Sequence, residues 1–213
     1  MNLFISFGVI ASTFAISTIT SFFICYANNC PFINPTFSKE ERMTKINEYI
    51  RNVPLLILQS TGLIYIVSDN ILPYGKHTWF ESLSSMCVYC ILIEANYYVY
   101  HRMIHKYYYA YVHKKHHANI IVYPFDTFYL TSLDDLASIV SIGMPIIFIN
   151  LSLYESMFIL YLFITASYLS HSELYWSHHS IPHKLLNYNY CILFPIFDII
   201  FGTYKTHSKR YVK

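Results

Sequence analysis

Histidines are the residues of this 213-residue chain with the greatest potential for chemistry, and ten of the eleven lie between residues 101 and 207. The ten are His101, His105, His113, His116, His117, His171, His178, His179, His183 and His207. A spacing of three or four residues brings side chains to one face of a helix. Neutral imidazole is a good ligand for iron, zinc, copper and nickel. The pattern therefore predicts a metal site that holds two ions, whereas His77 and His207 are expected to be ordinary polar residues.

The segments that position these histidines are mostly apolar, since 55% of the residues are hydrophobic and only 12% are charged. No charged side chain occurs from Met1 to Ser38, from Asn52 to Ser68 or from Leu136 to Tyr154. About 20 apolar residues in a helix cross the hydrocarbon core of a bilayer. Backbone groups in lipid need internal partners, which a helix provides. The sequence therefore predicts an all-α integral membrane bundle of about four to five spans.

The expected spans can be assigned along the chain as a single domain. They are Leu3–Tyr26, Val53–Leu72, Ser82–Tyr100 and two arms of a helical hairpin within residues 136–172 that turns around Asn150–Glu155. A short surface helix is expected over Lys39–Glu48, and the apolar patch Cys191–Phe201 is too short to span. Residues 1–80 then hold the first spans and their connector, and residues 81–213 form the histidine-bearing region.

Basic residues predict how the chain is oriented. Thirteen of the fourteen Lys and Arg fall in Lys39–Arg51, Arg102–Lys115 and Lys184–Lys213, which five spans would place on one side. That side is expected to be the cytosol, so the histidines would form a cytosolic metal cap and the C-terminus would be cytosolic. A metal transporter is a less favoured alternative, because transporters bind ions near the bilayer midplane and the expected spans contain no histidine. The sparse, interrupted basic residues give no support for nucleic-acid binding.

The ordered histidine motifs resemble those of the fatty acid hydroxylase and sterol desaturase superfamily. His-Arg-Met-Ile-His at residues 101–105 and His-Lys-Lys-His-His at 113–117 look like its first two histidine boxes. Residues 178–183, followed by Asn187–Tyr190 and Asp198–Thr203, resemble its third box and closing motif, in a form closest to the C-5 sterol desaturases. The resemblance covers roughly residues 85–205.

The resemblance implies a function, a cofactor and partners. Family members are integral endoplasmic reticulum proteins that hold two non-haem irons and use O2, with electrons from cytochrome b5 or a similar donor, to hydroxylate or desaturate a lipid. The substrate would be a sterol or a fatty acyl chain. The implied iron ligands are His101, His105, His113, His116, His117, His171, His179 and His183, and no catalytic residue is expected beyond this metal site.

Two acids are expected to orient imidazole rings. Glu94 lies two helical turns before His101 on the same face, and a carboxylate inside a span usually has a task. We expect it to accept an imidazole N–H, and Asp198, which matches the family's closing aspartate, to act in the same way. Pro182 stands where the family has a histidine, so His178 is a possible substitute ligand. Because proline cannot bind metal, the alternative function is a non-catalytic membrane scaffold.

The chain also departs from the family just before Asp134. Thr131 and Ser132 stand where many relatives have a histidine–proline pair, and Asp134 follows two residues later.

Overall fold

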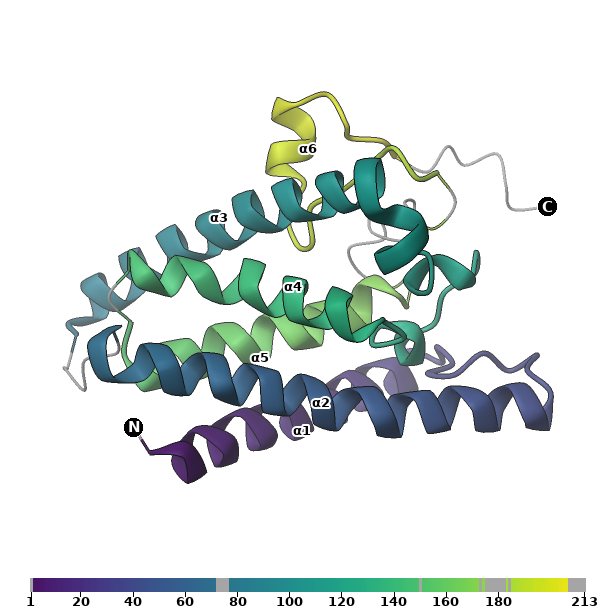
Figure 1. Ribbon diagram of the computed structural model, residues 1–213, viewed down its shortest axis with the longest axis horizontal. Helices are drawn as coiled ribbons and strands as arrows, with labels where there is room; N and C mark the ends of the chain where they lie inside the picture. Colours follow the sequence, from purple (N-terminus) through teal and green to yellow (C-terminus); the bar gives the residue numbers. More distant parts are fainter. Residues whose placement is uncertain are drawn as a thin grey trace.

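The computed structural model describes residues 2–71, 77–149, 151–172, 174, 183 and 185–206, with the backbone alone for residues 68–71. Every regular element in these ranges is a helix, which confirms the predicted all-α class (Figure 1). The α-helices are α1 (Leu3–Ala27), α2 (Lys39–Ile71), α3 (Trp79–Met103), α4 (Ser132–Gly143), α5 (Leu153–Ser170) and α6 (Ile196–Ile200). A π-helix, η1 (Ile104–His113), continues α3, and three short 3₁₀ segments are η2 (His116–Ala118), η3 (Pro124–Asp126) and η4 (Met144–Ile147).

Three of the long helices, α2, α3 and α5, begin at reciprocal caps that the sequence encodes. At the start of α3, the Thr78 backbone N–H donates to Glu81 Oε2 at 2.7 Å, and the Thr78 hydroxyl accepts from the Glu81 N–H at 3.3 Å. At the start of α5, Ser152 and Glu155 form the same pair. Each cap satisfies backbone N–H groups that have no partner inside the helix.

Helix α2 is longer than expected, because the surface helix and the second span are one continuous helix. Ser38 and Glu41 cap its start, and Pro54 lies inside it. Proline removes one backbone donor from the ladder, and tertiary bonds hold the neighbouring turn. The buried Asn52 donates from Nδ2 to the carbonyls of Phe128 and Leu130, at 3.1 and 3.0 Å.

The long helices lie side by side (Figure 1). Helix α1 packs against α5 and α2, α4 packs against α2 and α3, and α6 packs against α3. Small polar residues let α1 approach its neighbours closely; Ser6, Thr13, Ser17 and Ser21 are all buried. Their hydroxyls donate to carbonyls in their own helix or its cap, so none is left without a partner.

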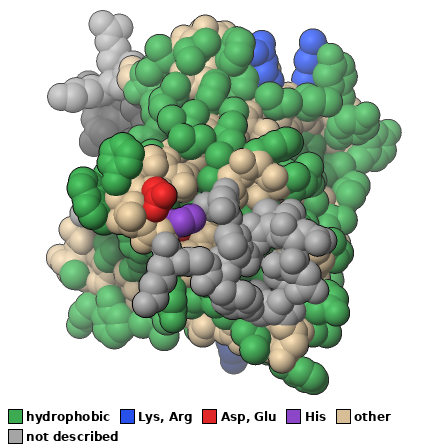
Figure 2. Space-filling view, turned by 90° about the vertical axis from the view of Figure 1, so that its left-hand side faces the viewer, with side chains coloured by type: hydrophobic (Ala, Val, Ile, Leu, Met, Phe, Trp, Pro, Cys, Tyr) green, Lys and Arg blue, Asp and Glu red, His purple; other side chains and the backbone are tan. Residues whose placement is uncertain are grey.

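Within the part of the chain that the structure describes, three helical segments are long and apolar enough to cross a membrane: Leu3–Ala27, Lys39–Val67 and Leu153–Ser170. The fourth expected span is shorter than predicted, because α4 has 12 residues and ends at Gly143 before η4. The total of four to five spans therefore stays a prediction. Figure 2 shows that the end of the bundle where α3 begins is covered mainly by hydrophobic side chains, and Trp79 and Tyr154 are largely exposed there.

Candidate metal centre

Seven of the eight histidines expected as ligands form two adjacent clusters. The four-histidine cluster consists of His101, His105, His113 and His117, and the three-histidine cluster consists of His116, His171 and His183. Within each cluster, ring nitrogens lie within 4.8 Å of one another. The eighth expected ligand, His179, and the possible substitute His178 lie outside the described residues, as does Pro182.

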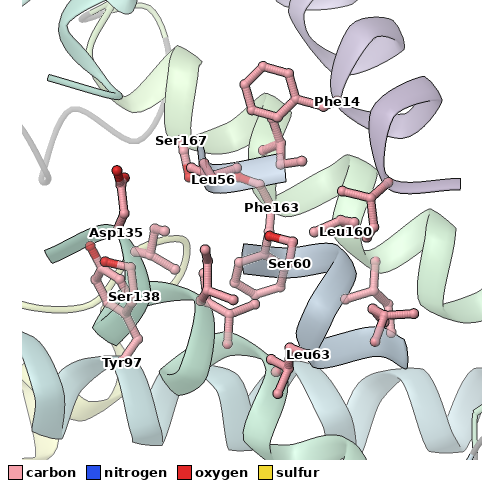
Figure 3. A pocket seen from close by; sticks show the side chains of 18 of the residues that line it. Phe14, Leu56, Ser60, Leu63, Tyr97, Asp135, Ser138, Leu160, Phe163 and Ser167 are labelled. Carbon is pink, nitrogen blue, oxygen red and sulfur yellow. Dashed lines mark hydrogen bonds between the residues drawn. The ribbon is translucent and has the colours of Figure 1, made fainter. Parts of the chain in front are cut away.

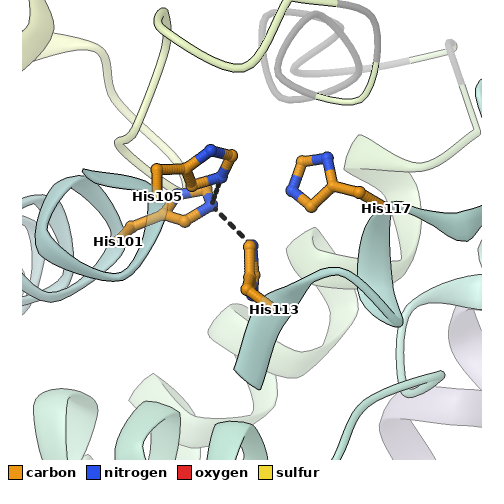
Figure 4. A group of neighbouring side chains, drawn as sticks. All are labelled: His101, His105, His113 and His117. Carbon is orange, nitrogen blue, oxygen red and sulfur yellow. Dashed lines mark hydrogen bonds between the residues drawn. The ribbon is translucent and has the colours of Figure 1, made fainter. Parts of the chain in front are cut away.

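The end of α3 and the π-helix that continues it build the four-histidine cluster. His101 Nε2 lies 3.1 Å from His105 Nε2 and 3.1 Å from His113 Nε2 (Figure 4). His105 follows His101 by four residues and their rings are close, as the spacing predicted. His105 and His113 are the second and last residues of the π-helix. Short π-helical segments are uncommon and occur frequently at functional sites. Here the segment brings histidines 12 residues apart to one point.

The second histidine box serves both clusters, although its spacing suggested a single face. His116 and His117 are adjacent in the chain and lie in different clusters. Neighbouring residues on a helical turn cannot share a face, so this box bridges the two sites. The His117 and His183 rings stack at 4.3 Å, and the His113 and His116 rings lie 5.1 Å apart. This proximity suits two metal ions held close together.

Backbone carbonyls fix the rings of two expected ligands. His101 Nδ1 lies 2.9 Å from the Tyr190 carbonyl oxygen, and His171 Nδ1 lies 2.8 Å from the Ser167 carbonyl oxygen. A metal-binding histidine almost always donates its other N–H to such a group, which fixes the tautomer and the ring orientation. In both rings, Nε2 is then the nitrogen left to bind metal.

Asp134 orients the imidazole ring of His113. We did not predict this role of Asp134 from the sequence. Its Oδ2 lies 2.8 Å from His113 Nδ1, and its Oδ1 accepts a hydrogen bond from the Tyr100 hydroxyl. The carboxylate is completely buried. Thr131 caps α4 and its hydroxyl accepts from the Asp134 N–H at 3.2 Å. The sequence did contain a signal for this role: a helix-capping residue, Thr131, is followed three positions later by an acid, Asp134, in the segment after the second histidine box.

Glu94 is connected to the histidines through the backbone. Its carboxylate accepts hydrogen bonds from the N–H groups of Ile192, Leu193 and Phe194, at 3.0, 2.7 and 3.2 Å. The acid is buried on α3 and fixes the loop at residues 190–194. This loop carries the Tyr190 carbonyl that orients His101, so any effect of Glu94 on the imidazole would pass through the loop backbone. The orienting role of Glu94 stays a prediction.

Asp198 holds the same loop from α6. Its two oxygens accept the backbone N–H groups of Tyr190 and Cys191, both at 2.8 Å, and the Thr203 hydroxyl donates to it at 2.7 Å. The side chain is completely buried. Its expected effect on imidazole orientation therefore also passes through Tyr190, and it too remains a prediction.

Burial lowers the pKa of six of the seven clustered histidines, which are His101, His105, His113, His116, His171 and His183. Burial lowers the pKa of His101 to about 4. Burial first, and neighbouring imidazoles second, hold the pKa values of His113, His116 and His183 well below the usual range. Metal binding requires the neutral ring. Two compact groups of neutral nitrogen donors, several with oriented rings, fit a pair of transition-metal ions.

A narrow cavity joins the three-histidine cluster to the interior of the bundle. Its volume is about 170 Å³, and His113, His116 and His171 line one part of it. It follows α5 as far as Leu153 at the start of that helix. Figure 3 shows mainly apolar side chains along it, with Asp135, Ser138 and Tyr97 grouped together.

His77 behaves as the ordinary polar residue that we expected. It precedes α3, and its Nδ1 lies 3.1 Å from both carboxylate oxygens of Glu155. It belongs to neither histidine cluster among the described residues.

Comparison with known proteins agrees with this geometry. The sequence model of the fatty acid hydroxylase family matches residues 86–203, which is more than half of the chain. The match includes all seven clustered histidines, Glu94, Asp134 and Asp198. No curated protein and no solved structure matches the chain.

Proposed function

The chain belongs to the fatty acid hydroxylase family, and from this premise we propose that it is an iron-dependent membrane oxidoreductase that uses O2 to hydroxylate or desaturate a lipid. The observation that carries the proposal is the pair of adjacent histidine clusters. Two iron ions bound there would supply O2 activation and the oxidising power to break an unactivated C–H bond. His101, His105, His113 and His117 would hold one ion, and His116, His171 and His183 the other.

The protein's own contribution is to orient its ligands and exclude water. Asp134 and the carbonyls of Ser167 and Tyr190 fix three imidazole rings before metal binds. Such preorganisation reduces the rearrangement that the site must undergo during reaction. The cavity beside the clusters is lined mainly by apolar side chains, so a substrate carbon can lie near the metals in a dry environment.

The shape of this cavity favours a single acyl chain over a sterol. Both Leu153, the first residue of α5, and His171, just after its end, line it. The 18 residues of α5 span about 27 Å at a rise of about 1.5 Å each. A volume of about 170 Å³ distributed over that length is narrow. A fused ring system would require the helices to separate, whereas an extended chain suits the shape.

We place the histidine end at the cytosolic face of the endoplasmic reticulum, where cytochrome b5 or a similar donor would deliver electrons. Support comes from the basic residues next to the first two histidine boxes, Arg102, Lys106 and Lys114. Positive charge near the site would attract an acidic electron carrier.

The decisive experiment combines metal analysis with lipid analysis. Purified protein is expected to contain iron, and cells that express it are expected to accumulate hydroxylated or desaturated acyl chains absent from cells that express His116→Ala. Unchanged lipids together with a lack of iron, under iron-replete expression, would contradict the proposed function.

A further inference from the structure

Asp135 is a buried acid whose carboxylate lacks a hydrogen-bond partner. Its side chain is 1% exposed, and neither Oδ1 nor Oδ2 is hydrogen-bonded to any described residue. A buried carboxylate is costly unless it is paired, and native proteins leave few such groups unsatisfied. The nearby cation does not satisfy it, because Lys115 Nζ bonds Glu48 Oε2. Asp135 therefore has two acceptor oxygens available to another molecule.

The cavity described above is the space that Asp135 faces. Asp135 lines it together with His113, His116 and His171, and no other acid lines it among the described residues. Figure 3 shows Asp135 near Ser138 and Tyr97, whereas Leu63 and Leu160 lie farther along the cavity. The acid is thus at the metal end of an otherwise mainly apolar channel.

Asp135 does not complete either metal cluster. Neither group of ligand atoms within 4.8 Å of one another includes it. Its neighbour Asp134 is the acid that contacts an imidazole, at 2.8 Å from His113. The two consecutive acids on α4 therefore have different surroundings, one facing a ligand ring and the other the substrate cavity.

We propose that Asp135 accepts a hydrogen bond from a hydroxyl or N–H group that a single-chain lipid carries close to the carbon that is oxidised. This inference rests on the proposed function and narrows its substrate class. A plain alkyl segment would leave the carboxylate buried and unpaired beside the reacting carbon. A chain with a donor at that point satisfies Asp135 and fixes which carbon faces the metals. Asp135 thereby determines both substrate choice and the position of oxidation.

The proposal predicts a binding preference that does not require metal. Burial raises the pKa of Asp135 to about 7, so binding is measured at about pH 8.5, where the carboxylate is charged. A hydrogen bond to a charged group should then favour a donor-bearing chain by about 10-fold or more. Dodecanol and dodecyl methyl ether form a matched pair, because both are slender and have an oxygen, but the ether cannot donate. Dodecane serves as the apolar reference.

The experiment measures binding of tritiated dodecanol to the metal-free full-length protein in amphipol, with the ether and dodecane as competitors. Wild type should bind dodecanol about 10-fold or more tighter than the ether. Asp135→Leu should abolish that preference while still binding the ether and dodecane, since leucine keeps the size and removes the acceptor. Asp135→Asn, whose amide oxygen still accepts, should lose only part of it.

Ser156→Ala is the control within the same cavity. Ser156 lines the part of the cavity near the start of α5, and its hydroxyl donates to the Ser152 carbonyl. The dodecanol preference should survive this change, and thermal unfolding checks that all variants fold.

Equal binding of dodecanol and the ether to wild type, or an undiminished preference in Asp135→Leu, would overturn the role of Asp135 and leave lipid oxidation by the metal site standing. A folded wild-type protein that binds none of the three chains would overturn the cavity as the substrate site, and the proposal with it.

Discussion

His113 Nδ1 lies 2.8 Å from Asp134 Oδ2, and both side chains are buried. This contact leaves His113 Nε2 facing His101 Nε2 at 3.1 Å. The ring is therefore held in one orientation by the buried acid behind it, which is the arrangement that strengthens an imidazole ligand.

Asp134→Asn is expected to lower metal affinity by about 10- to 100-fold, because the amide keeps the size but cannot ionise to orient His113 and strengthen it as a ligand. Chelator competition with the purified protein measures the affinity. Asp135→Asn makes the same chemical change next door, where the acid has no imidazole partner. Equal losses in the two variants would mean that general charge near the site, and not this contact, determines affinity.

Because the histidines form two clusters, a substitution in one cluster is expected to remove only the metal ion bound there. His105→Ala removes a donor from the four-histidine cluster, and His183→Ala removes one from the three-histidine cluster. Each variant is expected to bind about one iron where wild type binds two, and to lose lipid oxidation, because two-metal chemistry needs both ions. Elemental analysis of protein purified from iron-replete cells gives the stoichiometry.

His77→Ala is the control for this experiment. His77 pairs with Glu155 and belongs to neither cluster, so its removal should leave the iron content unchanged. Full iron content in both His105→Ala and His183→Ala would show that other residues bind the metals.

Local spacing accounts for what could be predicted of the fold and of the site. The apolar run at the N-terminus predicted Leu3–Tyr26 as a helix, and α1 covers Leu3–Ala27. The spacing of His101 and His105 also predicted their proximity correctly. In both cases the relevant atoms are separated by a few residues of regular helix, so the geometry follows from the helical repeat.

Tertiary contacts account for what the sequence could not provide. Glu94 was singled out by its spacing to His101, but its hydrogen-bond partners lie 98 to 100 residues away in the chain. No local pattern links Glu94 to Ile192. The division of His116 and His117 between clusters likewise depends on where α5 and the loop before α6 bring His171 and His183.

Glu94→Gln is expected to weaken both folding and metal binding. The amide can no longer satisfy all three backbone N–H groups of the 192–194 segment, and each buried group left unsatisfied costs about 1–3 kcal/mol. The loosened loop would also release the Tyr190 carbonyl from His101, so metal affinity should fall, by less than in Asp134→Asn. Thermal unfolding and chelator competition measure the two effects, and Asp198→Asn should behave alike.

Glu155→Gln separates a general loss of stability from an effect on the site. Glu155 is also a buried acid with several partners, but it lies at the start of α5. This variant should be destabilised with unchanged metal affinity. If Glu94→Gln bound metal as tightly as wild type, the loop would have no part in orienting His101.

The membrane orientation can be tested at the loop before α3. The structure places the start of α3 at the end of the bundle away from α6 (Figure 1), and the sequence predicts that this loop is luminal. A glycosylation acceptor inserted beside Lys76 is therefore expected to be modified in microsomes, whereas one added after Lys213 should remain unmodified. The opposite pattern would place the histidine clusters in the lumen and exclude a cytosolic electron donor.

The metal-free protein is expected to lose stability as the pH falls below about 6.5. Burial lowers the pKa of His101 to about 4 in the folded state, whereas an unfolded histidine has a pKa of about 6.5. Between these values the unfolded chain binds a proton that the folded chain does not, so the free energy of unfolding falls with the pH. At pH 5 His101 alone lowers the free energy of unfolding by about 2 kcal/mol.

Thermal unfolding of the metal-free protein at pH 7 and pH 5 measures this dependence, and His101→Gln provides the comparison. Glutamine does not titrate, so its variant should lose less stability between the two pH values than wild type, whatever its stability at pH 7. An identical pH dependence in wild type and His101→Gln would show that His101 is not held neutral by burial, and that the cluster is open to water before metal binds.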